Sequence, residues 1–227
     1  MNREELIRRL ILIKELGWVR STVPAPKNVG ELLEALLGLQ TNNLSDPDWG
    51  TIEVKSKRRR TNTRISLLTR VPTYHDNLSA RLFTKKYGYD RESGKALRGN
   101  LSAKEVDSRG WKLLVEHNRL GIEHKGSIVA HVDLDDIRQR IEKKLKSLVF
   151  VIADSEQRGK WEFFHFNEAY LCTRIEIDNL VKLLRNDELV FDFRMAFKGD
   201  KFVDKGTAYR IYSNNLPKLY SSVIRIM

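Results

Sequence analysis

The stretch PDWGTIEVKSKRRR, residues Pro47–Arg60, places two carboxylates and a lysine within eight residues and then adds four cations. Its centre, TIEVK, alternates polar and apolar residues, which predicts a strand with one buried face. On such a strand Glu53 and Lys55 share one face, while Ile52 and Val54 share the other. Two interpretations are open: a metal-dependent site that cleaves phosphodiesters, or a polar strand that enters a basic loop.

Segments on both sides of this strand predict helices as well as strands. Upstream, residues 2–17 and 28–38 have apolar side chains at helical spacing, and residues 19–27 are expected to form a loop. Downstream, residues 55–62 are expected to be a basic hairpin connection, too highly charged to be buried. Further strands are expected at 64–69, 111–117, 120–124, 127–132, 148–153, 161–166, 188–197 and 207–212, further helices at 77–86, 133–147 and 176–187, and an exposed basic loop at 198–206. The class is therefore α/β or α+β around a mixed sheet.

Composition points to a polyanionic partner. The 227 residues include 41 Lys and Arg against 30 Asp and Glu, which gives a net charge of +11 and a pI near 9.7. Such a balance favours nucleic acid. A lone cysteine, Cys172, excludes an intrachain disulfide and is typical of a reducing cytoplasm. No run approaches the roughly 18 apolar residues that span a bilayer, so we expect no membrane association.

Asp48, Glu53 and Lys55 are the candidate catalytic residues. Hydrolysis of a phosphodiester needs an activated water and neutralisation of charge on the phosphate, and Mg²⁺ held by one or two carboxylates supplies both. Asp48 and Glu53 are the candidate metal ligands, and Lys55 lies on the Glu53 face, where it can orient the water or stabilise the phosphate. Because Asp, Glu and Lys often meet by chance on a strand edge, their spacing alone does not exclude the second interpretation, a polar strand that enters a basic loop.

The same residues resemble the PD-(D/E)xK nuclease signature, with Pro47-Asp48 as the PD element and residues 53–55 as ExK. The longer stretch GELLEALLGLQTNNLSDPDWGTIEVKSK, residues 30–57, is similar to the MutH-like branch of that superfamily, and most similar to the MvaI/BcnI restriction endonucleases. In that branch a glutamate of the preceding helix reaches the active site, and Glu34 is the matching position. KGTAYRI, residues 205–211, resembles the C-terminal RGTAFRI-type segment of the family, apart from a Lys for Arg and a Tyr for Phe.

This resemblance implies a restriction-endonuclease-like fold, in which a mixed sheet is flanked by helices and two lobes surround a DNA cleft. We expect a single endonuclease domain, residues 1–227, with a catalytic lobe at about 1–90 and the remaining sheet and recognition lobe at about 91–227. The resemblance further implies Mg²⁺-dependent cleavage of double-stranded DNA at short CCNGG-like sites to leave 5′-phosphate ends, with Mn²⁺ as a substitute. It also implies a monomer that nicks the two strands in sequence, alongside a cognate DNA methyltransferase that is not a stable subunit.

Basic residues near both motifs are candidate DNA contacts. Arg210, in the C-terminal motif, and Arg194 are expected to read guanines, because the guanidinium fork matches O6 and N7. The other cations are expected to contact phosphates, which positions the protein without reading sequence. Solvated surface charge is the alternative for every one of them. These phosphate candidates are Lys57, Arg58, Arg59, Arg60, Lys198, Lys201 and Lys205.

Two other functions compete with restriction. A MutH-like repair endonuclease would nick one strand and need partner proteins. A DNA-binding module of nuclease ancestry would have no activity, but it would gain nothing from carboxylates that repel phosphate. The intact set Asp48, Glu53, Lys55 and Glu34 therefore favours an enzyme, and the closer match to MvaI/BcnI favours restriction over repair.

Overall fold

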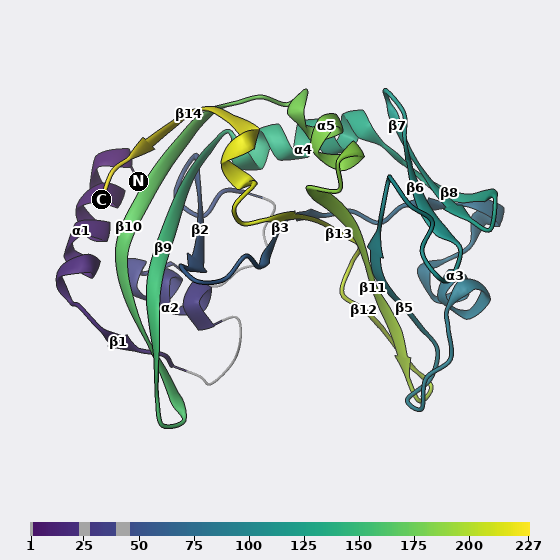
Figure 1. The fold of residues 1–227 in the computed structure, drawn as a ribbon, viewed down its shortest axis with the longest axis horizontal. Coiled ribbons are helices and arrows are strands. Elements are labelled where there is room, and N and C mark those ends of the chain that lie inside the picture. Colours follow the sequence, from purple (N-terminus) through teal and green to yellow (C-terminus); the bar gives the residue numbers. More distant parts are fainter. Residues whose placement is uncertain (1, 23–27, 40–45) are drawn as a thin grey trace. The chain divides into compact units, whose positions relative to one another are not determined.

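The computed structural model describes residues 2–22, 28–39 and 46–227 (Figure 1). The chain divides into two compact units, each assembled from separate segments. Unit 1 comprises Met1–Thr63, Glu142–Glu176 and Leu216–Met227, and unit 2 comprises Arg64–Ile141 and Ile177–Asn215. The sequential division expected near residue 90 stays a prediction, while the units themselves interleave along the chain.

Unit 1 contains a five-stranded sheet in the order β1-β10-β9-β2, with β14 also paired to β10. β2 runs parallel to β9, and the other pairings are antiparallel. β9 and β10 form the long green hairpin in Figure 1. The strands are β1 (Val19–Arg20), β2 (Ile52–Arg58), β9 (Ser147–Arg158), β10 (Trp161–Ile175) and β14 (Tyr220–Arg225).

Two helices, α1 (Arg3–Glu15) and α2 (Asn28–Leu37), cover one face of this sheet. The first turn of α1 is capped, since the Asn2 side chain accepts a hydrogen bond from the Glu5 backbone N–H at 2.8 Å. α2 ends at Leu37, and the next residue is Gly38, whose φ of 75° suits glycine. Apolar side chains of both helices share one core with Val54 and its neighbours on the strands. Glu53 and Lys55 therefore point to the other face of the sheet, as the alternation predicted.

The segment after Lys55 is not the expected hairpin. β2 continues to Arg58, because all of its residues pair in parallel with β9, from Ile52 beside Ser147 to Arg58 beside Ala153. The next strand, β3 (Arg64–Thr69), belongs to the sheet of unit 2. A second expected loop is also partly wrong: Val19–Arg20 forms β1, while residues 23–27 lie outside the described residues.

Unit 2 contains two sheets. One has the order β12-β11-β13-β3 with β5 paired to β11, and the other has the order β4-β8-β7-β6. The second includes the antiparallel meander predicted at 111–132. The expected loop at 198–206 instead holds β12, a hairpin partner of β11. These strands are β4 (Thr73–Tyr74), β5 (Ala96–Leu101), β6 (Trp111–Val115), β7 (Arg119–His124), β8 (Ser127–Asp133), β11 (Leu189–Lys198), β12 (Lys201–Asp204) and β13 (Ala208–Tyr212).

Three more helices complete the α+β class that the sequence predicted. α3 (Ala80–Tyr87) and α5 (Asn179–Arg185) belong to unit 2, and α5 is shorter than the long helix expected there. The division between units falls within α4 (Leu134–Leu145), which leads directly into β9. No helix among the described residues is long and apolar enough to cross a membrane.

Candidate active site

Three of the four predicted catalytic residues are brought together by β2. Glu53 and Lys55 lie on the same face of the strand and form an ion pair. Asp48 lies just before the strand, and its Oδ2 accepts a hydrogen bond from the Val54 backbone N–H at 3.0 Å. That bond draws the Asp48 carboxylate alongside the strand that carries Glu53 and Lys55. The chain segment between them is also anchored, because the indole of Trp49 donates to the Asn2 carbonyl at 3.0 Å.

Glu53 is the most unusual side chain of the site, because it is a fully buried carboxylate. Its Oε1 faces Lys55 and a second cation, Lys144, whose Nζ lies 3.5 Å away. Its Oε2 is buried and has no hydrogen-bond partner among the described residues. Burial raises the pKa of the Glu53 carboxyl, the charge of Asp48 raises it further, and the two lysines oppose the rise.

Glu34 comes to the site from α2. Burial raises the pKa of the half-buried Glu34 carboxyl, the charge of Asp48 adds to the rise, and Lys55 opposes it. Asp48 and Lys55 thus shift the pKa of both Glu34 and Glu53. Electrostatic interactions therefore connect all four predicted catalytic residues.

The carboxylates fit a divalent ion held by two protein ligands. Within the described ranges, no three His, Cys, Asp or Glu side chains gather closely enough to hold a metal. Mg²⁺ does not require three, since it keeps several waters and binds through one or two carboxylates. The buried Glu53 Oε2 offers an unsatisfied hard oxygen, and Asp48 uses only Oδ2 for the Val54 hydrogen bond. Asp48 and Glu53 are therefore the residues suited to hold the ion.

Lys144 is a site residue that the sequence reasoning missed. It lies near the end of α4, about 90 residues beyond Glu53 in the chain, and its side chain is 22% exposed. α4 leads into β9, and the parallel pairing of β9 with β2 sets Leu148 beside Glu53. Nothing in the local sequence reveals that pairing, so the amphipathic pattern of α4 alone could not assign Lys144 to the site.

Arg58 and Arg59, two of the four cations that follow the site, form ion pairs within the protein. Arg58 donates to both carboxylate oxygens of Glu162, at 2.5 and 2.7 Å, on the core face of the sheet. Arg59 pairs with Asp154 and with Glu168, both at 2.6 Å. A DNA contact from either arginine would have to compete with these ion pairs, and it stays a prediction.

The other two cations differ in exposure. The side chain of Lys57 is buried on the face that carries Glu53 and Lys55, and burial together with the nearby charge of Arg59 lowers the pKa of Lys57. Arg60 is exposed. Lys57 thus lies on the same face of β2 as the candidate catalytic residues, while Arg60 is exposed to solvent. Their proposed contacts with phosphate stay predictions.

The predicted base-reading arginines lie in unit 2, in fixed orientations. Arg210 donates from Nη1 to Asp192 Oδ2 at 2.9 Å and from Nη2 to the Arg64 carbonyl at 3.1 Å. Arg194 donates to the carbonyls of Lys205 and Gly206, at 2.7 and 2.9 Å. Arg194 therefore holds the loop of the C-terminal motif in place. The remaining phosphate candidates of unit 2, Lys198, Lys201 and Lys205, are exposed.

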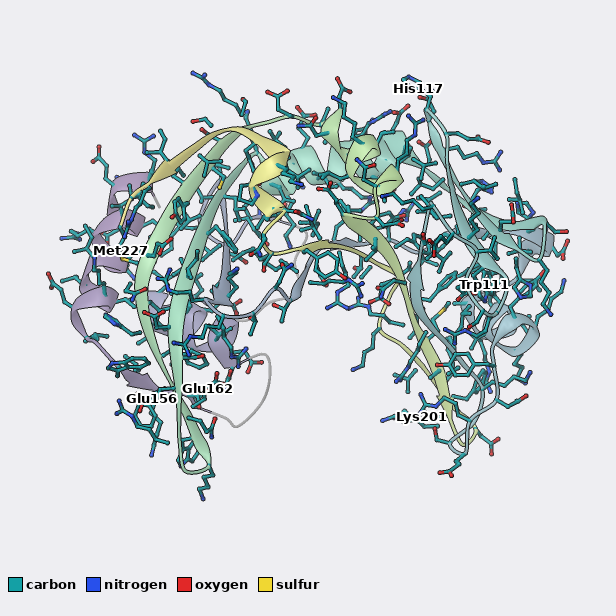
Figure 2. The ribbon with its side chains drawn as sticks, viewed as in Figure 1. Trp111, His117, Glu156, Glu162, Lys201 and Met227 are labelled. Carbon is teal, nitrogen blue, oxygen red and sulfur yellow. The ribbon has the colours of Figure 1, made fainter. Side chains whose placement is uncertain are left out.

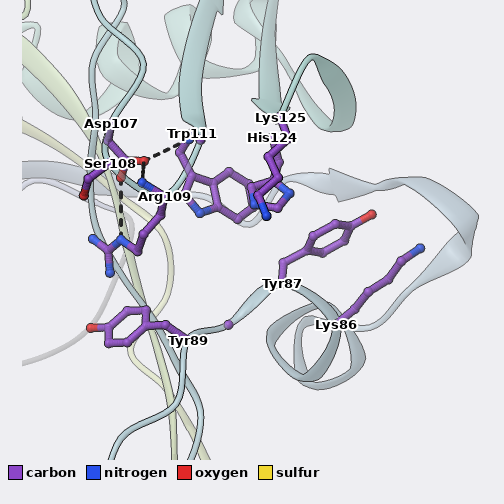
Figure 3. A pocket seen from close by; sticks show the side chains of 11 residues that line it. Lys86, Tyr87, Tyr89, Asp107, Ser108, Arg109, Trp111, His124 and Lys125 are labelled. Atoms are coloured by element: carbon purple, nitrogen blue, oxygen red, sulfur yellow. Dashed lines mark hydrogen bonds and ion pairs between the residues drawn. The ribbon is translucent and has the colours of Figure 1, made fainter.

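Unit 2 also contains a pocket of about 610 Å³ (Figure 3). Aromatic and basic side chains line it, among them Tyr87, Arg109, Trp111 and His124. None of the predicted catalytic or DNA-contacting residues is part of its lining. The candidate active site is therefore defined by the carboxylates and lysines of unit 1 and not by this pocket.

The arrangement on β2 can be compared with known proteins. The family model of the MvaI/BcnI restriction endonucleases matches residues 7–220. The chain belongs to this family. As an MvaI/BcnI member it is a type II site-specific deoxyribonuclease, and members of the family generally use divalent metal ions.

Solved structures of MvaI share the fold of this family member. The complex of restriction endonuclease MvaI with its cognate DNA substrate matches with a TM-score of 0.84 and 22% identity, over 100% of both chains. MvaI in the absence of DNA matches with a TM-score of 0.57 and 22% identity, over 100% of this chain and 99% of the other. No curated protein matches the sequence. The predicted restriction-endonuclease-like fold is confirmed.

Replacement of Lys144 tests its place in the site. Because Lys144 lowers the pKa of Glu53, the change Lys144→Gln raises that pKa further. If Glu53 holds the metal, it must be ionised, so activity is lost as the pH falls through its pKa, and the acid limb of the pH–rate profile should move to higher pH. The control is Lys143→Gln on the same helix, where Lys143 is 67% exposed and pairs with Asp46. An unchanged pH–rate profile, or an equal shift in both variants, would show that Lys144 does not act on Glu53.

Proposed function

We propose that this endonuclease cleaves both strands of double-stranded DNA in a Mg²⁺-dependent reaction, at a short CCNGG-like site, to leave 5′-phosphate and 3′-hydroxyl ends. The observation that carries the proposal is the buried Oε2 of Glu53, which has no hydrogen-bond partner in the described part of the chain and lies on the same strand as Lys55 and near Asp48. A buried carboxylate oxygen without a partner is costly, and a bound cation is the partner that its chemistry fits.

When bound by Asp48 and Glu53, Mg²⁺ would activate a water and neutralise charge that builds on the scissile phosphate. Mn²⁺ should substitute, because it prefers the same oxygen ligands. Lys55 would bring a positive charge to the same face of β2, where it can orient the attacking water or stabilise the pentavalent phosphate. The side chain is held there by its ion pair with Glu53 and is 24% exposed.

Glu34 would accept a proton or a hydrogen bond from the attacking water. Its carboxyl is half-buried, and its raised pKa makes it a better base near neutral pH than an ordinary glutamate. The neighbouring charge of Asp48 sustains that rise when no cation is bound. A cation held by Asp48 and Glu53 would lower the pKa of Glu34, which would couple the protonation of Glu34 to metal binding.

A monomer that nicks the two strands in sequence is the simplest assembly. The described residues contain one set of Asp48, Glu53 and Lys55, so one chain can cut one strand at a time. A second cut then requires rebinding in the opposite orientation. Sequence specificity implies that the host DNA needs protection, so we propose a cognate methyltransferase in the same system and a cytoplasmic site of action.

Replacement of either proposed metal ligand should abolish cleavage. The variants Asp48→Asn and Glu53→Gln remove a charge with little change of shape, and each should lower the cleavage rate at least about a thousandfold, because metal catalysis is worth several kcal/mol. DNA binding should persist, since each change removes a repulsive charge. The matched control is Asp46→Asn, two residues upstream, whose carboxylate is 61% exposed and paired with Lys143. Full cleavage by either site variant would overturn the proposed centre.

Arg210→Ala should reduce discrimination more than general affinity. A bidentate guanine contact is worth about 1–3 kcal/mol, which is roughly 5- to 150-fold in specificity. Arg210→Lys should have a similar effect, because an ammonium keeps the charge and loses the fork. The control Lys198→Ala should weaken binding to specific and random duplexes equally. If Arg210→Ala also weakens both equally, Arg210 contacts a phosphate and reads no base.

A further inference from the structure

The far end of the β9–β10 hairpin carries stacked aromatic and basic side chains. Arg158 lies over the rings of Trp18 and Phe163, at 5.6 and 4.6 Å from their centroids. Arg20 and Lys160 lie over the ring of Trp161, at 4.7 and 5.7 Å. We call these six residues the hairpin cluster: Trp18, Arg20, Arg158, Lys160, Trp161 and Phe163.

The sheet register places this cluster on the face that carries the catalytic residues. Lys55 is paired with Phe150, and every second residue of β9 from Phe150 onward shares that face, up to Arg158. Arg158 is paired with Trp161 on β10, and directly paired residues share a face. Phe163 follows two residues later on β10, and its partner on β1 is Arg20. The cluster and the catalytic residues thus lie along one surface of unit 1.

The other face of the hairpin has a different role. Phe164 and Phe166 point into the core beneath the two N-terminal helices. Glu162, labelled in Figure 2, also belongs to that face and is held by Arg58. Its charge therefore does not cancel the cations of the cluster. The alternation of the strand separates a structural face from a face that presents cations and rings to solvent.

The cations of the cluster are suited to contact phosphate. Stacking uses the flat face of a guanidinium and leaves its N–H groups, which lie in the plane, for hydrogen bonds. Only Arg158 has a carboxylate partner, Glu156 at 2.9 Å, whereas neither Arg20 nor Lys160 forms an ion pair with a described residue. The group is also accessible: Trp18 is 41% exposed and the Arg158 side chain 46%. Ordered cations in excess over acids favour a polyanion as the ligand.

We propose that the hairpin cluster binds the phosphate backbone of duplex DNA outside the recognition site. This inference rests on the proposed function. From Phe150 to Arg158 the strand advances about 26 Å at roughly 3.3 Å per residue, which corresponds to about 8 base pairs of B-DNA. The contact reads no sequence. It makes affinity depend on the length of flanking DNA, and it keeps the protein on the duplex between successive cuts.

The test compares two duplexes that carry the cleaved site, with about 4 or about 15 flanking base pairs on each side. Affinity is measured with Ca²⁺ in place of Mg²⁺, so that bound DNA stays intact, across a range of salt concentrations. The wild-type protein should bind the long duplex more tightly than the short one. The double variant Arg20→Gln, Lys160→Gln should lose most of that preference, with a salt slope on the long duplex reduced by about 2, and should cleave the short duplex at the wild-type rate.

The matched control removes two charges from the opposite side of the sheet, with Arg3→Gln and Arg8→Gln on α1, and should keep the preference for long DNA. Thermal unfolding of both double variants checks that the hairpin is intact. An equal loss of length preference in the two variants, or the absence of that preference in the wild type, would overturn the inference. Failure of the wild type to cleave any duplex would instead overturn the proposed function, so the two failures are distinguishable.

Discussion

The parallel pairing of β2 with β9 is the constraint on which the active site depends. It sets Glu53, on the edge strand of the sheet, beside Leu148, and the carboxylate is fully buried there. It also brings the end of α4, with Lys144, next to Glu53. Because the side chains of paired residues on parallel strands point to the same side, Lys55 and Lys57 lie on the same face of the sheet as Phe150 and Ile152 of β9. The β2–β9 pairing thus determines which side chains lie on the face of the candidate active site, both on β2 and along the β9–β10 hairpin.

The site holds a carboxylate that is unfavourable in the absence of a cation. Burial of a charge costs several kcal/mol unless partners compensate, and the two lysines compensate only one oxygen of Glu53. The raised pKa of both Glu53 and Glu34 reflects the same imbalance. A fold tolerates such a cost where chemistry requires it, since perturbed carboxylates gather at functional sites. The electrostatics and the family membership therefore point to the same metal-dependent hydrolysis.

Much of the site followed from local sequence, and the remainder depended on long-range pairing. The alternation of TIEVK predicted that Glu53 and Lys55 share a face, and the helical spacing of apolar residues predicted the first helix. Local pattern could not show that β2 pairs with a strand 95 residues further along the chain, so the segment after Lys55 was wrongly expected to be an exposed hairpin. Lys144 was missed for the same reason.

The most direct measurement of the central claim is digestion of unmethylated plasmid DNA by the purified protein, in Mg²⁺ and in EDTA, followed by sequencing of every end. We predict discrete fragments in Mg²⁺ only, with 5′-phosphates and one short motif shared by all ends. Nicks confined to one strand would instead indicate a repair endonuclease, and tight binding without any product in Mg²⁺ would contradict the assignment of Asp48, Glu53 and Lys55 as a catalytic centre.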